Sequence, residues 1–86
     1  MTYRIQRAVE PDGVIFLLSG ELDAEHVDKL RVLMEREDSA HVRVDLRDVT
    51  VVQPVGVTFL ARLEPAGVVL VNCADYIRRL IAEEPS

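Results

Sequence analysis

Residues 14–27 read V-I-F-L-L-S-G-E-L-D-A-E-H-V, and the prediction of the fold starts from this stretch. Its first five residues are continuously apolar, a pattern typical of a strand that is covered on both faces. We therefore expect a strand over Val14–Ser19, near the centre of a sheet. The polar residues that follow predict a change from strand to helix.

Asp23 marks the start of that helix. Its carboxylate can accept a backbone N–H of the first turn, and Leu22 and Val27 have the spacing of a hydrophobic staple. The helix should begin at Ala24. Its predicted apolar stripe consists of Val27, Leu30, Leu33 and Met34.

Upstream of this stretch, the sequence predicts a hairpin. Polar and apolar residues alternate over Tyr3–Val9, which indicates a strand. Glu10-Pro11-Asp12-Gly13 has proline at the second turn position, where its fixed φ fits, and glycine at the fourth. This turn should join the first strand to Val14–Ser19.

Downstream, Glu37-Asp38-Ser39 ends the first helix, and His41–Leu46 alternates strictly between polar and apolar residues. A strand, a helix and a strand in this order predict two parallel strands joined by a right-handed crossover. Val49–Val52 then leads to a short helix from Pro54 to about Leu63, with Val57, Leu60 and Ala61 on its buried face.

The last third of the chain predicts one more strand and one more helix. Pro65-Ala66-Gly67 breaks the second helix, and Val68–Val71 reads as a buried strand. A final helix with Ile77, Leu80 and Ile81 on its apolar face ends before Pro85. The predicted order is β-β-α-β-α-β-α.

Composition narrows the class of protein. The 86 residues, 1–86, allow a single domain, and 49% hydrophobic residues suffice for a core. The formal charge of −5 with ten scattered basic residues argues against nucleic-acid binding, so a protein partner or a small ligand is favoured. The sequence shows neither the apolar region of a secretory signal nor a segment that could span a membrane, and the single Cys73 cannot form an internal disulfide. We therefore expect a soluble protein in the reducing environment of the cytoplasm.

The junction V-V-Q-P-V-G-V-T, residues 51–58, has no hydroxyl, carboxylate or imidazole over Gln53–Gly56. A helix start carries free N–H groups and a positive dipole end, so it suits a phosphate or a carboxylate. Gln53 is a poor N-cap, which costs about 1 kcal/mol, but Pro54 fits the first helical position. The junction keeps a helix start without a reactive group.

Several motifs in their order resemble the STAS domain of anti-sigma factor antagonists. They are L-S-G-E-L-D-A (18–24), V-R-V-D-L-R-D-V-T (42–50), Gly56, A-G-V-V-L-V-N (66–72) and I-R-R-L (77–80). The resemblance covers roughly Val14 to Ile81. It implies an α/β STAS-like fold with a mixed four-stranded sheet and helices packed mainly on one face.

The resemblance also implies what is missing. In that family an Asp-Ser-Ser-Gly stretch begins the second helix, and its first serine is phosphorylated by a kinase that is also the anti-sigma factor. Aligned on Gly56, the aspartate falls on Gln53, the phosphorylated serine on Pro54 and the second serine on Val55. We therefore expect no phosphorylation at the family position. Thr58 and Thr50 are conceivable substitutes, although ordinary structural threonines are the favoured reading.

Other candidate groups have simpler explanations. His26 and His41 are far apart and lack companion ligands, so surface histidines are expected rather than a metal site. Cys73 has no neighbouring histidine or lysine, although Arg78 and Arg79 follow, and is expected to be partly buried.

Asp45 and Asp48 end a strand where α/β enzymes place acids, yet no nucleophile or phosphate loop accompanies them. We expect no enzyme activity, no cofactor and no metal.

We predict a non-catalytic protein-interaction module of bacterial transcription regulation that binds a kinase-type anti-sigma factor or a related regulator. Pro54, Val55 and Val57 are expected to form a small apolar patch, with simple packing of these residues as the equally weighted alternative. Glu21, Asp23 and Glu25 either cap the first helix or frame a docking face shared with Gln53. The alternative function is an accessory subunit of a membrane transport complex or a small-anion-binding domain, and the chain should be a monomer or weak homodimer. The predicted partner-binding residues are Asp23, Glu25, Gln53, Pro54, Val55, Gly56, Val57 and Thr58.

Overall fold

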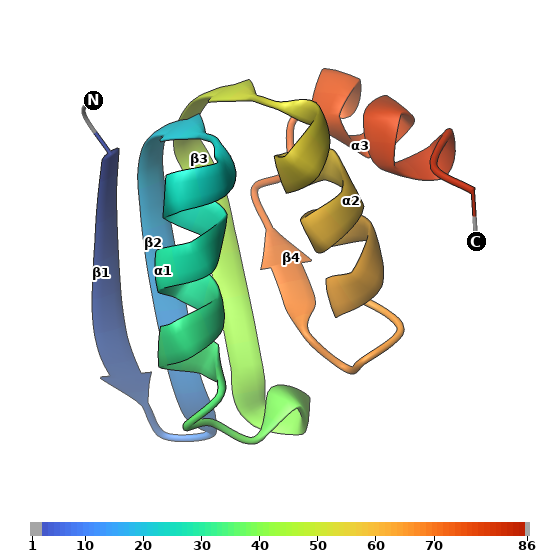
Figure 1. Cartoon of the computed structure of the whole chain (residues 1–86). Coiled ribbons are helices and arrows are strands. Elements are labelled where there is room, and N and C mark those ends of the chain that lie inside the picture. Colours follow the sequence, from blue (N-terminus) through green and yellow to red (C-terminus); the bar gives the residue numbers. More distant parts are fainter. Residues whose placement is uncertain (1–2, 86) are drawn as a thin grey trace.

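A four-stranded mixed sheet with three helices forms the domain, in a computed structural model that describes residues 3–85 (Figure 1). The strands lie in the order β1-β2-β3-β4. β1 pairs antiparallel with β2, whereas β2–β3 and β3–β4 are parallel. The predicted α/β class, the mixed sheet and the order β-β-α-β-α-β-α are confirmed. In chain order the elements are β1 (Tyr3–Glu10), β2 (Gly13–Leu22), α1 (Ala24–Met34), a 3₁₀ turn η1 (Ser39–His41), β3 (Val42–Val52), α2 (Pro54–Leu63), β4 (Val69–Val71) and α3 (Asp75–Ala82).

The hairpin forms as the turn residues predict. Glu10 pairs with Gly13 across the turn, and the register continues without interruption to Tyr3 and Gly20. Gly13 has φ +148°, and a Cβ there would lie 2.0 Å from the carbonyl oxygen of His41. Glycine is required at this position by both the backbone conformation and the close approach of the next strand.

β2 is central, but the prediction that both of its faces are covered is wrong. Burial alternates along the strand, with Val14, Phe16 and Leu18 buried and Ile15 and Leu17 only half-buried. Figure 1 shows α1 and α2 in front of the same face of the sheet. The apolar run therefore reflects one face in the core and one partly open face.

The last strand is also less buried than predicted. Val68 is 3% exposed, but the strand proper begins at Val69, which is 54% exposed. Because β4 lies at the end of the strand order, it pairs on one side alone, with β3.

The core lies between the sheet and the helices and joins all three helices to it. α1 contributes Val27 and Leu30, α2 contributes Leu60 and Leu63, and α3 contributes Ile77. Leu33, expected in the α1 stripe, is 37% exposed instead, and α1 ends at Met34 rather than near Glu37. Among the described residues, no helix is long and apolar enough to cross a membrane.

Two leucines test this assignment of the core. Leu60 is completely buried, whereas Leu80 is 37% exposed, and both lie on helices. Leu60→Ala should lower the free energy of unfolding by about 2–5 kcal/mol, because it leaves a cavity in the core. Leu80→Ala should cost less than about 1 kcal/mol. Urea denaturation followed by circular dichroism measures both, and equal losses would contradict the assignment.

Candidate functional site

The first turns of α1 and α2 lie next to each other at the carboxyl ends of β2 and β3. α1 begins after β2 and α2 begins after β3, and these strands are parallel, so both junctions lie at the same end (Figure 1). The side-chain amide of Gln53 donates to Glu21 Oε2, and the backbone N–H of Gln53 donates to the carbonyl of Leu22 at 3.0 Å. The expectation that Glu21 lies beside the Gln53 junction is confirmed.

Gly56 allows α2 to sit directly on the end of β2. A Cβ at this position would lie 2.7 Å from the carbonyl oxygen of Leu22 and 3.0 Å from side-chain atoms of Leu22 and Val52. Real Cβ atoms essentially never approach a backbone oxygen so closely. The glycine is therefore needed for close packing, since its φ lies outside the left-handed region.

The start of α2 offers few donors to an anion. Gln53 makes no side-chain cap, and Pro54 at the first helical position has no N–H. The N–H groups of Gly56 and Val57 both donate to the carbonyl of Gln53, at 2.8 and 3.1 Å. At most the N–H of Val55 remains free to bind an anion. The negative carboxylate of Glu21 lies beside Gln53 and would repel an anion there. This helix start is a poor phosphate site.

The predicted partner-binding residues divide into exposed and buried groups. Pro54, Val55 and Glu25 are exposed, and Asp23, Gln53 and Thr58 are half-buried. Gly56 is buried and Val57 is 6% exposed, so neither lies on a surface. The predicted patch of Pro54, Val55 and Val57 is thus wrong for Val57, which faces the core on the same side of α2 as Leu60.

An exposed apolar residue that sequence reasoning missed lies on the strand before the junction. Val51 is 48% exposed and Val55 is 41% exposed. Val51 belongs to an apolar run that resembles a buried strand, so no local signal distinguishes it from its neighbours. Its exposure follows from the uncovered face of the sheet.

At the start of α1, Asp23 acts as the predicted cap, because its Oδ1 accepts the N–H of His26 at 3.0 Å. The expectation that His26 is a surface residue is wrong, since its side chain is 0% exposed. Its ring stacks on Tyr3 with 4.5 Å between centroids, and Nδ1 lies 3.0 Å from the carbonyl oxygen of Glu21. Nε2 has no hydrogen-bond partner among residues 3–85. His41, in contrast, is exposed as predicted.

Thr58 links α2 to the segment that follows α3. Its hydroxyl lies 3.2 Å from the carbonyl oxygen of Pro54 and donates to Glu84 Oε1 at 2.6 Å. Thr50 is exposed, and its carbonyl accepts the hydroxyl of Tyr76 at 3.3 Å. The Thr58 side chain therefore has a structural role, whereas Thr50 contributes its backbone carbonyl to the contact with Tyr76.

Asp45 also has a structural role. It is 8% exposed, and its Oδ1 accepts the N–H of Arg47 at 2.9 Å and the amide of Asn72 at 3.1 Å. These bonds tie β3 to the end of β4, while Asp48 lies exposed. Within residues 3–85 no group of three or more potential metal-ligating side chains is assembled.

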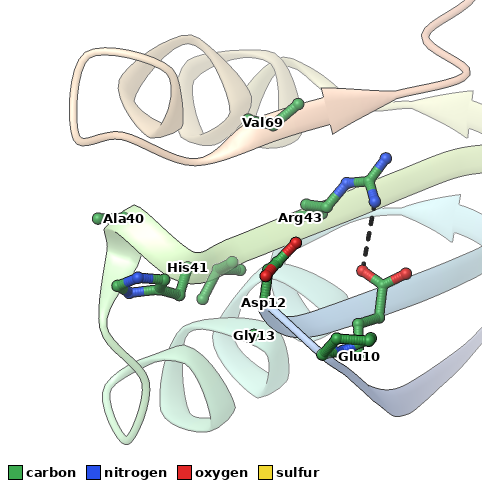
Figure 2. A pocket seen from close by; sticks show the side chains of 9 residues that line it. Glu10, Asp12, Gly13, Ala40, His41, Arg43 and Val69 are labelled. Atoms are coloured by element: carbon green, nitrogen blue, oxygen red, sulfur yellow. Dashed lines mark hydrogen bonds and ion pairs between the residues drawn. The ribbon is translucent and has the colours of Figure 1, made fainter.

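The described residues also line hollows at both ends of the domain. Beside the junction, a groove of about 400 Å³ is lined by Arg31, Val55, Thr58, Phe59, Arg62 and Leu63. At the opposite end, a pocket of about 290 Å³ lies between the hairpin turn and the start of β3. Figure 2 shows the side chains that line it. There Arg43 donates to Glu10 at 3.3 Å, so these two charges satisfy each other. The groove includes Val55 and Thr58 of the predicted site.

Comparisons with known proteins support the fold. No family model matches the chain, and no curated protein sequence matches it. The structure is similar to that of the anti-sigma factor antagonist SpoIIAA in its unphosphorylated form, with a TM-score of 0.70 and 16% identity over 98% of this chain and 84% of that one. It is also similar to a structure of Mglu, with a TM-score of 0.65 and 21% identity over 81% of this chain but 19% of that one. The chain has a STAS-like fold.

The close contact at Gly56 makes a direct prediction. Gly56→Ala should destabilise the domain by about 1–3 kcal/mol, because the added methyl group forces α2 away from the end of β2. Helix propensity alone predicts the opposite sign. Val55→Ala, at the preceding exposed position, is the matched control and should change stability by less than about 0.5 kcal/mol. Thermal unfolding measures both variants, and a stabilised Gly56→Ala would rule out the close contact.

Cys73 provides a prediction about pH. Burial raises the pKa of its thiol, and the nearby cation of Arg78 lowers it by a smaller amount. A raised pKa means less thiolate at neutral pH, so alkylation by iodoacetamide should reach half its maximal rate at a higher pH than for free cysteine. Arg78→Ala should move this midpoint further upward. A midpoint below that of free cysteine would contradict the assignment.

Proposed function

We propose that this domain is a non-catalytic protein-interaction module that binds a kinase-type anti-sigma factor or a related regulator without being phosphorylated at the start of α2. In this proposal it acts in the cytoplasm of a bacterium, in the control of transcription. The observation that carries the proposal is a helix start preserved in geometry but without a hydroxyl. Pro54 and Val55 are exposed in its first turn, where the resemblance places the two serines.

The surroundings of the junction suit a protein partner. The side chain of Val55 is part of the lining of the groove, together with Phe59, Arg31 and Arg62. The guanidinium of Arg31 lies 5.8 Å from the centre of the Phe59 ring. Apolar and aromatic surface with arginines at its margin is typical of protein interfaces. The Gln53–Glu21 hydrogen bond links the start of α2 to the end of β2, so these two segments are joined before a partner binds.

The alternative of a small anion at this helix start has less support. Anion sites at helix termini use several free N–H groups of the first turn. Here Pro54 has none, and those of Gly56 and Val57 are already bonded to Gln53. The geometry supports contact through side chains rather than capture of a phosphate.

Calorimetry with candidate kinase-type anti-sigma factors tests the binding surface. Val55→Asp should weaken binding at least about tenfold, because it places an unpaired charge in a desolvated contact. Val32→Asp, on the exposed side of the last turns of α1, introduces the same charge away from the junction and should bind normally. Absence of binding to every candidate, or equal effects of both variants, would overturn the proposal.

Mass spectrometry after incubation with the same kinases and ATP tests independence from phosphorylation. No phosphate is expected on residues 53–57, which contain no hydroxyl. Thr58 should also remain unmodified, because its hydroxyl is engaged with Glu84 and Pro54. Stoichiometric phosphate on Thr58 would contradict this proposal, because it would show that the phosphorylation site has moved to Thr58 rather than been lost.

A further inference from the structure

β1 presents an open edge of the sheet. It is the first strand in the order β1-β2-β3-β4 and pairs on one side alone, with β2. Figure 1 shows it at one margin of the molecule, with no helix in front of it. Half of its backbone N–H and C=O groups therefore point away from the sheet, where another strand can pair with them.

This edge has few of the features that normally prevent such pairing. Short strands, prolines, bulges and charged side chains protect the edges of natural sheets. Of these features β1 has the charged side chains, those of Arg4, Arg7 and Glu10. β1 has eight residues without proline, and its register with β2 runs unbroken over eight pairs. The opposite edge, β4, has three residues. Val9 of β1 is 74% exposed, the largest value among the big exposed apolar side chains in the described part of the chain.

The side chains along β1 are complementary to a second copy of β1. Arg4 and Glu10 point to the open face of the sheet, whereas Ile5 and Val9 point to the helix face, as their pairing with Leu18 and Val14 shows. In an antiparallel pair with two-fold symmetry, one residue must lie opposite its own copy, and opposite residues share a face.

We propose that two copies of this chain pair through β1 in an antiparallel, two-fold arrangement with Arg7 opposite Arg7. In this register Arg4 lies opposite Glu10 of the second copy, and Ile5 lies opposite Val9 of the second copy. The symmetry produces each contact twice. The two sheets join into one of eight strands, and the helices stay on a common face.

Other registers lose these contacts. With Gln6 opposite itself, Arg4 meets Ala8 and Ile5 meets Arg7. With Ala8 opposite itself, Gln6 meets Glu10 and Arg7 meets Val9. Opposite charges and apolar pairs directly across a ladder are favourable. The register centred on Arg7 is the one that supplies both.

Arg4 and Glu10 are free to form an ion pair across the proposed interface, and the charge of Arg7 is offset within each copy. Arg4 makes no ion pair with residues 3–85, and Arg43 binds Glu10 through Oε1, which leaves Oε2 for a further donor. The two Arg7 side chains lie opposite each other, but each Nε already donates to Glu37 Oε2 at 2.9 Å. This ion pair offsets the repulsion between the two guanidinium groups.

Sedimentation equilibrium of the full chain up to about 1 mM should show a reversible dimer. Arg4→Glu should raise the dissociation constant about tenfold, because two attractive pairs become repulsive. The double variant Arg4→Glu/Glu10→Arg should restore dimerisation. Arg62→Glu, which makes the same change of net charge on α2, should leave the dimer intact.

Cross-linking tests the register directly. In a Cys73→Ser background, Arg7→Cys should form a disulfide-linked dimer under mild oxidation, because position 7 faces its own copy. Gln6→Cys should not, since its own copy lies two positions away along the ladder, beyond the distance that a disulfide spans.

A monomer at every concentration would overturn the proposal. The edge of β1 would then be open to pairing with a strand of another protein. A dimer that is insensitive to Arg4→Glu, or cross-linking at position 6 instead of 7, would overturn it as well. None of these measurements requires a regulatory partner, so their failure is distinct from that of the proposed function.

Discussion

The close contact between Gly56 and the carbonyl of Leu22 sets the geometry on which the rest of the domain depends. It places the first turn of α2 directly on the end of β2, while the N–H of Gln53 bonds the same carbonyl. Leu60 and Leu63, further along α2, are thereby directed into the core against the sheet. A side chain at position 56 would separate the helix from the strand, so one absent methyl group determines both the packing of α2 and the position of the junction.

The same contact explains the chemistry of the junction. With α2 held against β2, the buried side of its first turn is Gly56 and Val57, and the exposed side is Pro54 and Val55. The proline maintains the helix start without a capping side chain, yet it removes a donor that an anion would need. The exposed corner at the start of α2 is therefore mainly apolar. Such a corner suits recognition by a protein better than capture of a phosphate.

Much of this fold was predictable, because hydrophobic periodicity and local turn chemistry report on local structure. The turn Glu10–Gly13, the cap at Asp23 and the helix start at Pro54 all occur where expected. The errors concern the ends of some elements, such as the end of α1 at Met34, and above all burial. His26 was expected on the surface, but Tyr3 covers its ring from a strand more than twenty residues earlier. Val57 was expected both on the buried face of α2 and in an exposed patch, and the direction in which α2 packs confirms the first expectation and excludes the second.

The sequence by itself determined the order of the elements, the starts of α1 and α2 and the absence of a hydroxyl from Gln53–Gly56. These features depend on neighbouring residues, through backbone conformation, capping and alternation. The tertiary structure alone decided that Ile15 and Leu17 of β2 lie on a partly open face, that Tyr3 buries His26, and that β1 remains an open edge. Those features depend on contacts between distant segments, whose formation is governed by packing and chain topology rather than by any local pattern.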